Sequence, residues 1–124
     1  MTAPLALLFY ENLLPGSQLI NRLQDLGYRV QATGDANALI SQAVSEKPLV
    51  VMADLASTRN DVCAMIRELK SRSDTKHIPV IAFTGIKNEQ LHLDARSAGA
   101  TLVAGDDALL QQLPQLLQQA LEVE

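Results

Sequence analysis

The sequence predicts an α/β fold in which a single doubly wound, five-stranded parallel sheet carries helices on both faces. Short apolar runs alternate with amphipathic stretches along the 124 residues, and most of these runs are continuously apolar, as in strands covered on both sides. Only short connections separate each run from the following stretch. Strands joined through helices run parallel, and right-handed crossovers place the intervening helices against the sheet.

Five apolar runs are expected to form the strands. They cover residues 5–10, 28–32, 49–53, 78–83 and 101–104. The third run, LVVMA, gives the strongest signal and leads directly into Asp54. The second run alternates between apolar and polar residues, which indicates a less buried strand.

Helices are expected between the strands because apolar residues recur there at helical spacing and stop signals follow. Gly27 ends the first helix, and Pro48 follows the second. In the third, apolar residues fall at positions i, i+3, i+4 and i+7, counted from Val62, and Asn60 or Asp61 is the expected N-cap. A fourth helix is expected over residues 88–98.

The end of the chain, from Asp107 onwards, is rich in Leu and Gln and is expected to be helical. Pro114 should kink this helix or restart it, because proline cannot donate a backbone hydrogen bond. The uncharged Gln side chains would permit a homodimer through this C-terminal helical face. No composition break divides the sequence, so residues 1–124 are expected to form one domain.

Charge and cysteine content exclude several classes of protein. The net charge is −4 and no stretch is strongly basic, which argues against a nucleic-acid surface and against a membrane-surface helix. No apolar run approaches the roughly 20 residues that span a bilayer, and no signal peptide is evident. Cys63 is the single cysteine and is expected to be a packing residue rather than a reactive thiol. We therefore expect a cytoplasmic protein.

Polar side chains follow the expected strands at the edge of the sheet where their carboxyl ends meet. Glu11 follows the first strand, Asp54 the third and Thr84 the fourth. Two carboxylates and a hydroxyl on neighbouring loops could hold Mg²⁺, which often takes one or two protein carboxylates and completes its shell with water. His77 and His92 are expected to lie far from this edge and to have surface roles.

The order and spacing of these segments resemble the response-regulator receiver domain family (CheY-like) over nearly the whole chain. The matching segments are residues 7–12 (LLFYEN), 50–54 (VVMAD), 79–85 (PVIAFTG) and 98–100 (AGA). The resemblance implies a flavodoxin-like, receiver-type fold and a role in two-component phosphorelay signalling. It implies that Asp54 is the phosphoacceptor, that Thr84 is the switch hydroxyl and that Glu11 and Asp54 are Mg²⁺ ligands. It also implies a protein partner, either a sensor kinase or a downstream signalling protein.

Several family features are missing. The Lys-Pro pair after the last strand is replaced by Ala104-Gly105, or by Asp106-Asp107 if no gap is allowed. The aromatic switch residue of that strand is absent, and Tyr10 occupies the place of one acid of the acidic pair. A hydrogen bond to a charged group contributes about 1.5–3 kcal/mol, so loss of the lysine alone would weaken a phosphorylated state. The resemblance therefore favours a degenerate member, or pseudo-receiver.

Three functions follow. The first is a receiver-like signalling domain with weak or lost phosphorylation that acts by docking to other proteins and is not an enzyme. The second is a working receiver in which Asp54 accepts a phosphoryl group with Mg²⁺. The third is a flavodoxin-like domain that binds a small ligand, although the sequence has no Gly-rich phosphate loop and only 3% aromatic residues.

Overall fold

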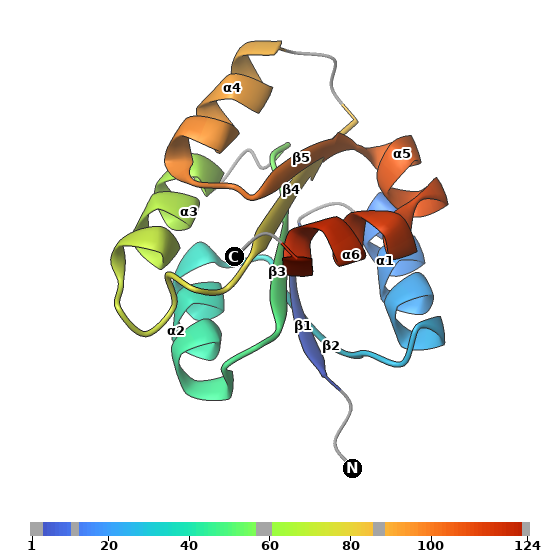
Figure 1. Ribbon diagram of the computed structural model, residues 1–124, viewed down its shortest axis with the longest axis horizontal. Helices are drawn as coiled ribbons and strands as arrows, with labels where there is room; N and C mark the ends of the chain where they lie inside the picture. Colours follow the sequence, from blue (N-terminus) through green and yellow to red (C-terminus); the bar gives the residue numbers. More distant parts are fainter. Residues whose placement is uncertain (1–3, 11–12, 57–60, 86–88, 123–124) are drawn as a thin grey trace.

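Five parallel strands form the single sheet of the computed structural model, in the order β2-β1-β3-β4-β5 (Figure 1). The structure describes residues 4–10, 13–56, 61–85 and 89–122. The strands are β1 (Leu5–Phe9), β2 (Arg29–Thr33), β3 (Val50–Asp54), β4 (Val80–Thr84) and β5 (Leu102–Gly105). The helices are α1 (Leu13–Asp25), α2 (Ala36–Glu46), α3 (Val62–Ser71), α4 (Glu89–Ala98), α5 (Asp106–Gln111) and α6 (Leu113–Glu122). The predicted fold class is confirmed, and the strand order is the flavodoxin-like one.

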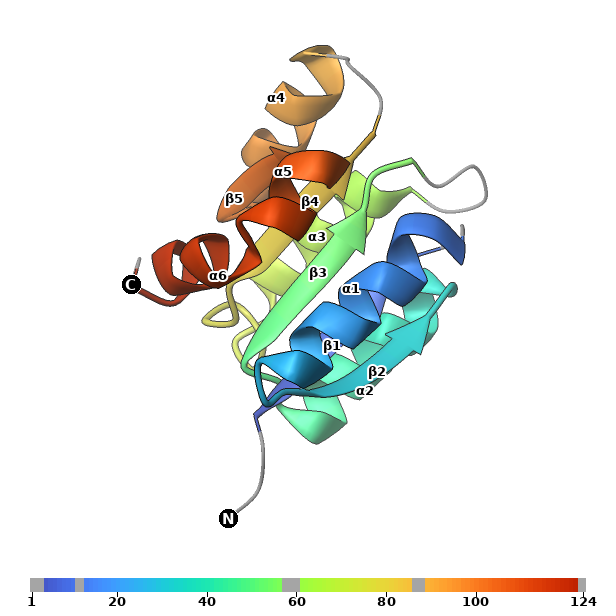
Figure 2. The same ribbon diagram turned by 90° about the vertical axis from the view of Figure 1, so that its right-hand side faces the viewer.

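Side chains alternate between the two faces of the sheet, so the central strands supply two separate cores. On one face, residues such as Leu7 and Val51 pack with α2, α3 and α4. On the other face, residues such as Leu8 and Met52 pack with α1, α5 and α6. Figure 1 shows these two helix layers on either side of the sheet, and Figure 2 looks onto the layer that contains α1. Each fully buried Leu or Val contributes about 1.5–3 kcal/mol, so both layers hold the sheet firmly.

The strands differ in burial according to their place in the sheet. Every residue of β1, β3 and β4 is buried, whereas β2 and β5 lie at the two edges and are partly exposed. The lower burial that the alternating pattern predicts for the second strand is confirmed. The residues at the carboxyl ends of the three central strands are therefore held in place by fully buried strands.

The ends of the elements follow local chemistry. The Asp61 side chain caps α3, where its Oδ1 accepts a hydrogen bond of 3.0 Å from the Ala64 amide. The C-terminal helix does restart, because α5 ends before Pro114 and that proline lies in the first turn of α6. β5 runs one residue further than predicted, to Gly105, so Asp106 is the first residue of α5.

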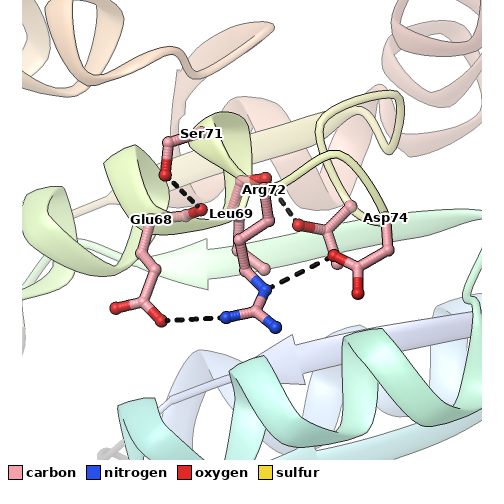
Figure 3. A network of polar contacts seen from close by, with 6 residues as sticks. Glu68, Leu69, Ser71, Arg72 and Asp74 are labelled. Carbon is pink, nitrogen blue, oxygen red and sulfur yellow. Dashed lines mark hydrogen bonds and ion pairs between the residues drawn. The ribbon is translucent and has the colours of Figure 1, made fainter.

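A polar network surrounds the C-terminal end of α3 (Figure 3). Ser71 Oγ donates to the Glu68 carbonyl at 2.9 Å, and the Arg72 guanidinium lies 3.7 Å from Glu68 and 3.4 Å from Asp74. These groups are exposed, so each pair contributes little to stability. Deeper in the same turn, the buried Thr75 hydroxyl donates to the Leu69 carbonyl at 2.6 Å. The buried bond is the one that anchors the turn leading to β4.

Candidate functional site

Asp54 ends the central strand β3 at the carboxyl edge of the sheet. Its side chain is 3% exposed, and Oδ1 accepts a hydrogen bond of 2.9 Å from the Ala56 amide. This is an Asx turn, in which the carboxylate fixes the chain as it leaves the strand. β3 lies beside β1, where the strand order reverses, and ligands of such sheets bind at this reversal. Asp54 thus lies where the sequence predicts the centre of the site.

Thr84 ends the neighbouring strand β4 and is also buried, at 2% exposure. The register pairs Asp54 with Phe83, so Thr84 lies one residue beyond the partner of Asp54. The Leu55 amide donates to the Phe83 carbonyl at 2.8 Å and continues the pairing past Asp54. The structure therefore places Asp54 and Thr84 on adjacent strand ends, as predicted.

Asp106 is the next polar residue along this edge, after Asp54 and Thr84. The register pairs Thr84 with Gly105, so Asp106 lies one residue beyond that pair, at the start of α5. Burial raises the pKa of the Asp106 carboxyl group, and the nearby charges of Asp54 and then Asp107 raise it further. Its Oδ1 is buried and has no hydrogen-bond partner among the described residues. Two acids thus lie close together at the carboxyl edge.

Asp106 was not one of the predicted site residues. The sequence left two alignments open after the last strand, and in the ungapped one Asp106 stands where the resemblance implies a lysine. The register shows that Asp106 lies at the carboxyl edge, one residue beyond the pair of Thr84 and Gly105. The signal in the sequence was the Asp106-Asp107 pair that directly follows the last strand.

Gly85 lets the backbone pass close to this acid. A Cβ atom at Gly85 would lie 2.7 Å from Asp106 Oδ2, which is closer than real contacts allow. Glycine here allows the Asp106 carboxyl group to approach the backbone closely, and a side chain at this position would make that carboxyl group shift. Because position 85 has no side chain, the Asp106 carboxyl group can lie close to the end of β4.

A hollow of about 360 Å³ opens beside these residues. Its lining includes Thr84, Gly85, Asp106, Asp107 and His92. The expectation that His92 lies far from the carboxyl edge is wrong. α4 begins at Glu89, soon after β4 ends, so its first turn still lies at this edge. The described residues that line the hollow include no lysine or arginine.

Asp54 is the predicted Mg²⁺ ligand that lies within the described residues. Glu11 lies outside the described residues, so its relation to Asp54 is not described. Asp54 supplies one carboxylate at the expected place, which suits an ion that keeps most of its water shell. Within the described part of the chain, no group of three or more His, Cys, Asp or Glu side chains could hold a metal ion.

Cys63 and His77 lie away from this site. Cys63 is half-buried against the core that contains α3, and burial, Asp61 and Asp94 raise the pKa of its thiol, whereas Arg67 lowers it. A raised thiol pKa suits a packing residue. His77 lies at the opposite edge of the sheet, beside Pro79, as expected.

Within the described ranges, none of the helices has the length and apolar character that a membrane span needs.

Comparison with known proteins identifies the fold. No protein-family model matches the sequence, and no curated protein matches it either. Among solved structures, the chain is similar to the receiver domain of a sensor histidine kinase from Pseudomonas aeruginosa, which was crystallised with a magnesium ion coordinated in the active site cleft. The two share 20% identity with a TM-score of 0.86, over 96% of this chain and 98% of that one.

Two further structures show the same similarity. A putative response regulator from Chloroflexus aurantiacus is 17% identical, with a TM-score of 0.88 over 96% of this chain and 98% of that one. The chemotaxis protein CheY4 from Vibrio cholerae is 18% identical, with a TM-score of 0.84 over 95% of this chain and 98% of that one. At these identities the similarity establishes the fold, and the chain has the fold of receiver domains.

Proposed function

We propose that the chain is a receiver-type signalling domain of the two-component kind, in which phosphorylation of Asp54 is weak or lost and the signal passes by contact with a partner protein. The observation that carries this proposal is the position of Asp106, whose carboxyl group lies near enough to Asp54 for the charge on Asp54 to raise its pKa. The partner is a sensor kinase or a downstream signalling protein. The domain acts in the cytoplasm and turns over no substrate.

Electrostatics explain why Asp106 opposes phosphorylation. A phosphoryl group on Asp54 would bring roughly two negative charges to the site, and an adjacent carboxylate repels them. Burial strengthens this repulsion, because Asp54 is 3% exposed and Asp106 Oδ1 is fully buried. A lysine at this place would donate a charged hydrogen bond of about 1.5–3 kcal/mol. Replacing attraction by repulsion therefore lowers the population of a phosphorylated form.

A working phosphoacceptor is the second candidate. The specific observation in its favour is that Asp54 and Thr84 are both buried at the carboxyl ends of adjacent strands. With Glu11 and Asp54 as ligands, Mg²⁺ would neutralise part of the charge at the site when bound. In this reading Asp54 attacks phosphorus, the bond to the leaving group breaks, and Thr84 would donate its hydroxyl hydrogen to a phosphoryl oxygen.

The test is the intact mass of the protein after incubation with acetyl phosphate and Mg²⁺. We expect little or no adduct on the wild type, none on Asp54→Ala, and a yield at least about tenfold higher on Asp106→Lys. Asp25→Lys is the matched control, because it adds the same charge on an exposed residue of α1, outside this hollow. Rapid modification of the wild type, unchanged in Asp106→Lys, would instead support the working phosphoacceptor.

Self-association through the C-terminal helices is part of the proposal. The outer surface of α6 carries exposed glutamines, among them Gln115, Gln118 and Gln119, beside the half-buried Leu116. An uncharged surface can pair with a copy of itself without charge repulsion. Light scattering at high protein concentration tests this. A dimer that Leu116→Glu dissociates is expected, and a monomer at all concentrations would rule it out.

A further inference from the structure

A second hollow lies at the opposite edge of the sheet, where the strands begin, and has a volume of about 590 Å³. We call it the amino-edge hollow. Leu5 and Arg29 are the first residues of β1 and β2, and Leu49 and Pro79 directly precede β3 and β4. Backbone hydrogen bonds of 2.8 Å join the Arg29 amide to Pro4 and the Leu49 amide to Leu5. The walls of this hollow are thus held by the sheet itself.

The inner wall of the amino-edge hollow is apolar. Pro48, Ile78 and Pro79 are buried there, and Leu49 is a large apolar side chain that stays 42% exposed at the rim. Leu121 of α6 also lines it. Covering the exposed Leu49 side chain with an apolar group of a partner removes its surface from water and favours binding.

Leu121 connects this hollow to another apolar surface. It also lines a neighbouring hollow of about 380 Å³, together with Tyr28 and with Leu26, which is 43% exposed. The apolar lining therefore continues from the start of the strands onto α6. A single small ligand would not cover both hollows, whereas a segment of polypeptide would.

The rim of the amino-edge hollow is basic. Arg29 at the start of β2 and Lys47 directly after α2 contribute exposed, positively charged side chains, and Glu46 is the one acid among the described lining residues. This contrasts with the chain as a whole, whose net charge is −4. The local charge therefore favours a ligand that carries carboxylates.

The chain holds Lys47 in a fixed place on this rim. Lys47 closes α2 in a left-handed conformation with φ of 51°, and its amide donates to the Ala43 carbonyl at 3.2 Å. The following Pro48 is buried in the wall of the hollow. The backbone of Lys47 is therefore fixed at the rim, and its exposed side chain extends from there.

We propose that the amino-edge hollow binds a segment of a partner protein that carries aliphatic side chains flanked by carboxylates. The aliphatic side chains pack on Leu49 and Leu121, and the carboxylates face Arg29 and Lys47. This contact lies at the other edge of the sheet from Asp54 and is independent of the chemistry there. It gives the domain a second surface for a partner.

The test uses the full ¹⁵N-labelled chain and a synthetic peptide in which two leucines are flanked by pairs of glutamates. We expect saturable amide shifts at residues 29, 47, 49 and 77–78, and no such shifts with the peptide in which lysines replace the glutamates. The paired variant Arg29→Glu/Lys47→Glu should bind about tenfold more weakly. The paired variant Arg67→Glu/Arg96→Glu, on exposed positions of α3 and α4, is the matched charge control and should bind like the wild type.

Additional variants separate this proposal from others. Leu49→Ser should weaken binding while leaving thermal unfolding nearly unchanged, since the side chain is exposed. Asp54→Ala should bind the peptide like the wild type, which keeps this result apart from any failure of the proposed function. Equal binding of the lysine peptide, or no shifts at these amides at millimolar peptide, would overturn the proposal. Saturable shifts with octanoate alone would also overturn it and assign the hollow to a small amphiphilic anion.

Discussion

The Asp54 carboxylate at the end of β3 raises the pKa of the Asp106 carboxyl group at the start of α5, adding to the larger effect of burial. Asp54 ends β3 and Asp106 directly follows β5, and β4 with Thr84 lies between these two strands. Their proximity makes the carboxyl edge a place where further negative charge is unfavourable. This relationship affects stability as well as phosphorylation.

We predict that Asp106→Asn flattens the pH dependence of stability. The folded-state pKa of Asp106 lies above the unfolded value of about 3.9, so the folded state binds this proton more tightly. Stability is therefore lost as the pH rises from about 4 through the folded pKa, and it stays lower at neutral pH. The variant should be more stable than the wild type at pH 7 and approach it near pH 4, as measured by urea unfolding.

The exposed Asp25 at the end of α1 provides the control for this measurement. Asp25→Asn removes the same charge from the chain but lies on another element, so it should leave the pH dependence close to that of the wild type. If Asp106→Asn and Asp25→Asn changed the pH profile equally, a general charge effect would explain both and the coupling to Asp54 would be contradicted.

Gly85→Ala should destabilise the protein by about 1–2 kcal/mol, because its Cβ would meet Asp106 Oδ2 at 2.7 Å and the carboxyl group must move. In the Asp106→Ala background the same change should cost close to nothing, since the opposing atoms are gone. A double-mutant cycle by chemical denaturation measures this difference. An equal cost in both backgrounds would show that Gly85 is required for another reason.

Much of the fold could be predicted because the burial of a strand determines which of its residues are apolar. The continuous apolar run at Leu5 and the alternation at Tyr28 distinguish a central strand from an edge strand, and the structure confirms both. The end of the first helix at Gly27 and the restart at Pro114 could be predicted for a different reason. Glycine adopts positive φ easily and proline cannot donate a backbone hydrogen bond, so each residue restricts the backbone locally.

The remainder of the site depends on distances that no local pattern encodes. Asp54 and Thr84 could be predicted because each ends a recognisable strand. Asp106 required the exact end of β5, where a shift of one residue changes which side chain meets Asp54. His92 depended on where α4 begins, and the amino-edge hollow joins residues as distant as Leu5 and Leu121. Such sites follow from packing of whole elements.

We predict that Cys63 reacts several-fold more slowly with iodoacetamide than a free thiol at pH 7.5. Burial, Asp61 and Asp94 raise the pKa of its thiol and so reduce the reactive thiolate. Asp94→Asn should speed alkylation, measured by intact mass over time, and unfolding in urea should speed it further. Alkylation of the folded protein at the rate of glutathione would contradict the prediction.

Thr75→Val should destabilise the protein by about 1–3 kcal/mol. The Thr75 hydroxyl is 0% exposed and donates to the Leu69 carbonyl at 2.6 Å, so valine leaves that carbonyl without this donor. Ser71→Ala is the matched control, because Ser71 also donates to a carbonyl of α3 but is exposed (Figure 3). We expect the control to change stability by less than about 0.5 kcal/mol. Similar losses in thermal unfolding for both variants would show that burial of the bond is unimportant.

Two glycines with positive φ allow backbone strain to be separated from packing. Gly27 has φ of +92° and open space where a Cβ would lie, whereas Gly99 has φ of +118° and a Cβ there would lie 2.7 Å from Lys70 Cγ. Lys70 cannot move aside freely, because its Nζ donates to the Ile78 carbonyl at 2.7 Å. Gly27→Ala should therefore cost about 1–2 kcal/mol, and Gly99→Ala clearly more.

Lys70→Ala tests the source of this difference. It removes Lys70 Cγ but leaves Cβ, which would lie 3.2 Å from a Cβ at position 99, so the cost of Gly99→Ala should fall toward that of Gly27→Ala without vanishing. The cost of Gly27→Ala should stay the same in both backgrounds, because Gly27 has no contact to relieve. Urea unfolding of the single and double variants measures all four values. If Gly99→Ala cost the same with and without the Lys70 side chain, the left-handed backbone alone would account for the glycine, and the contact with Lys70 would have no energetic role.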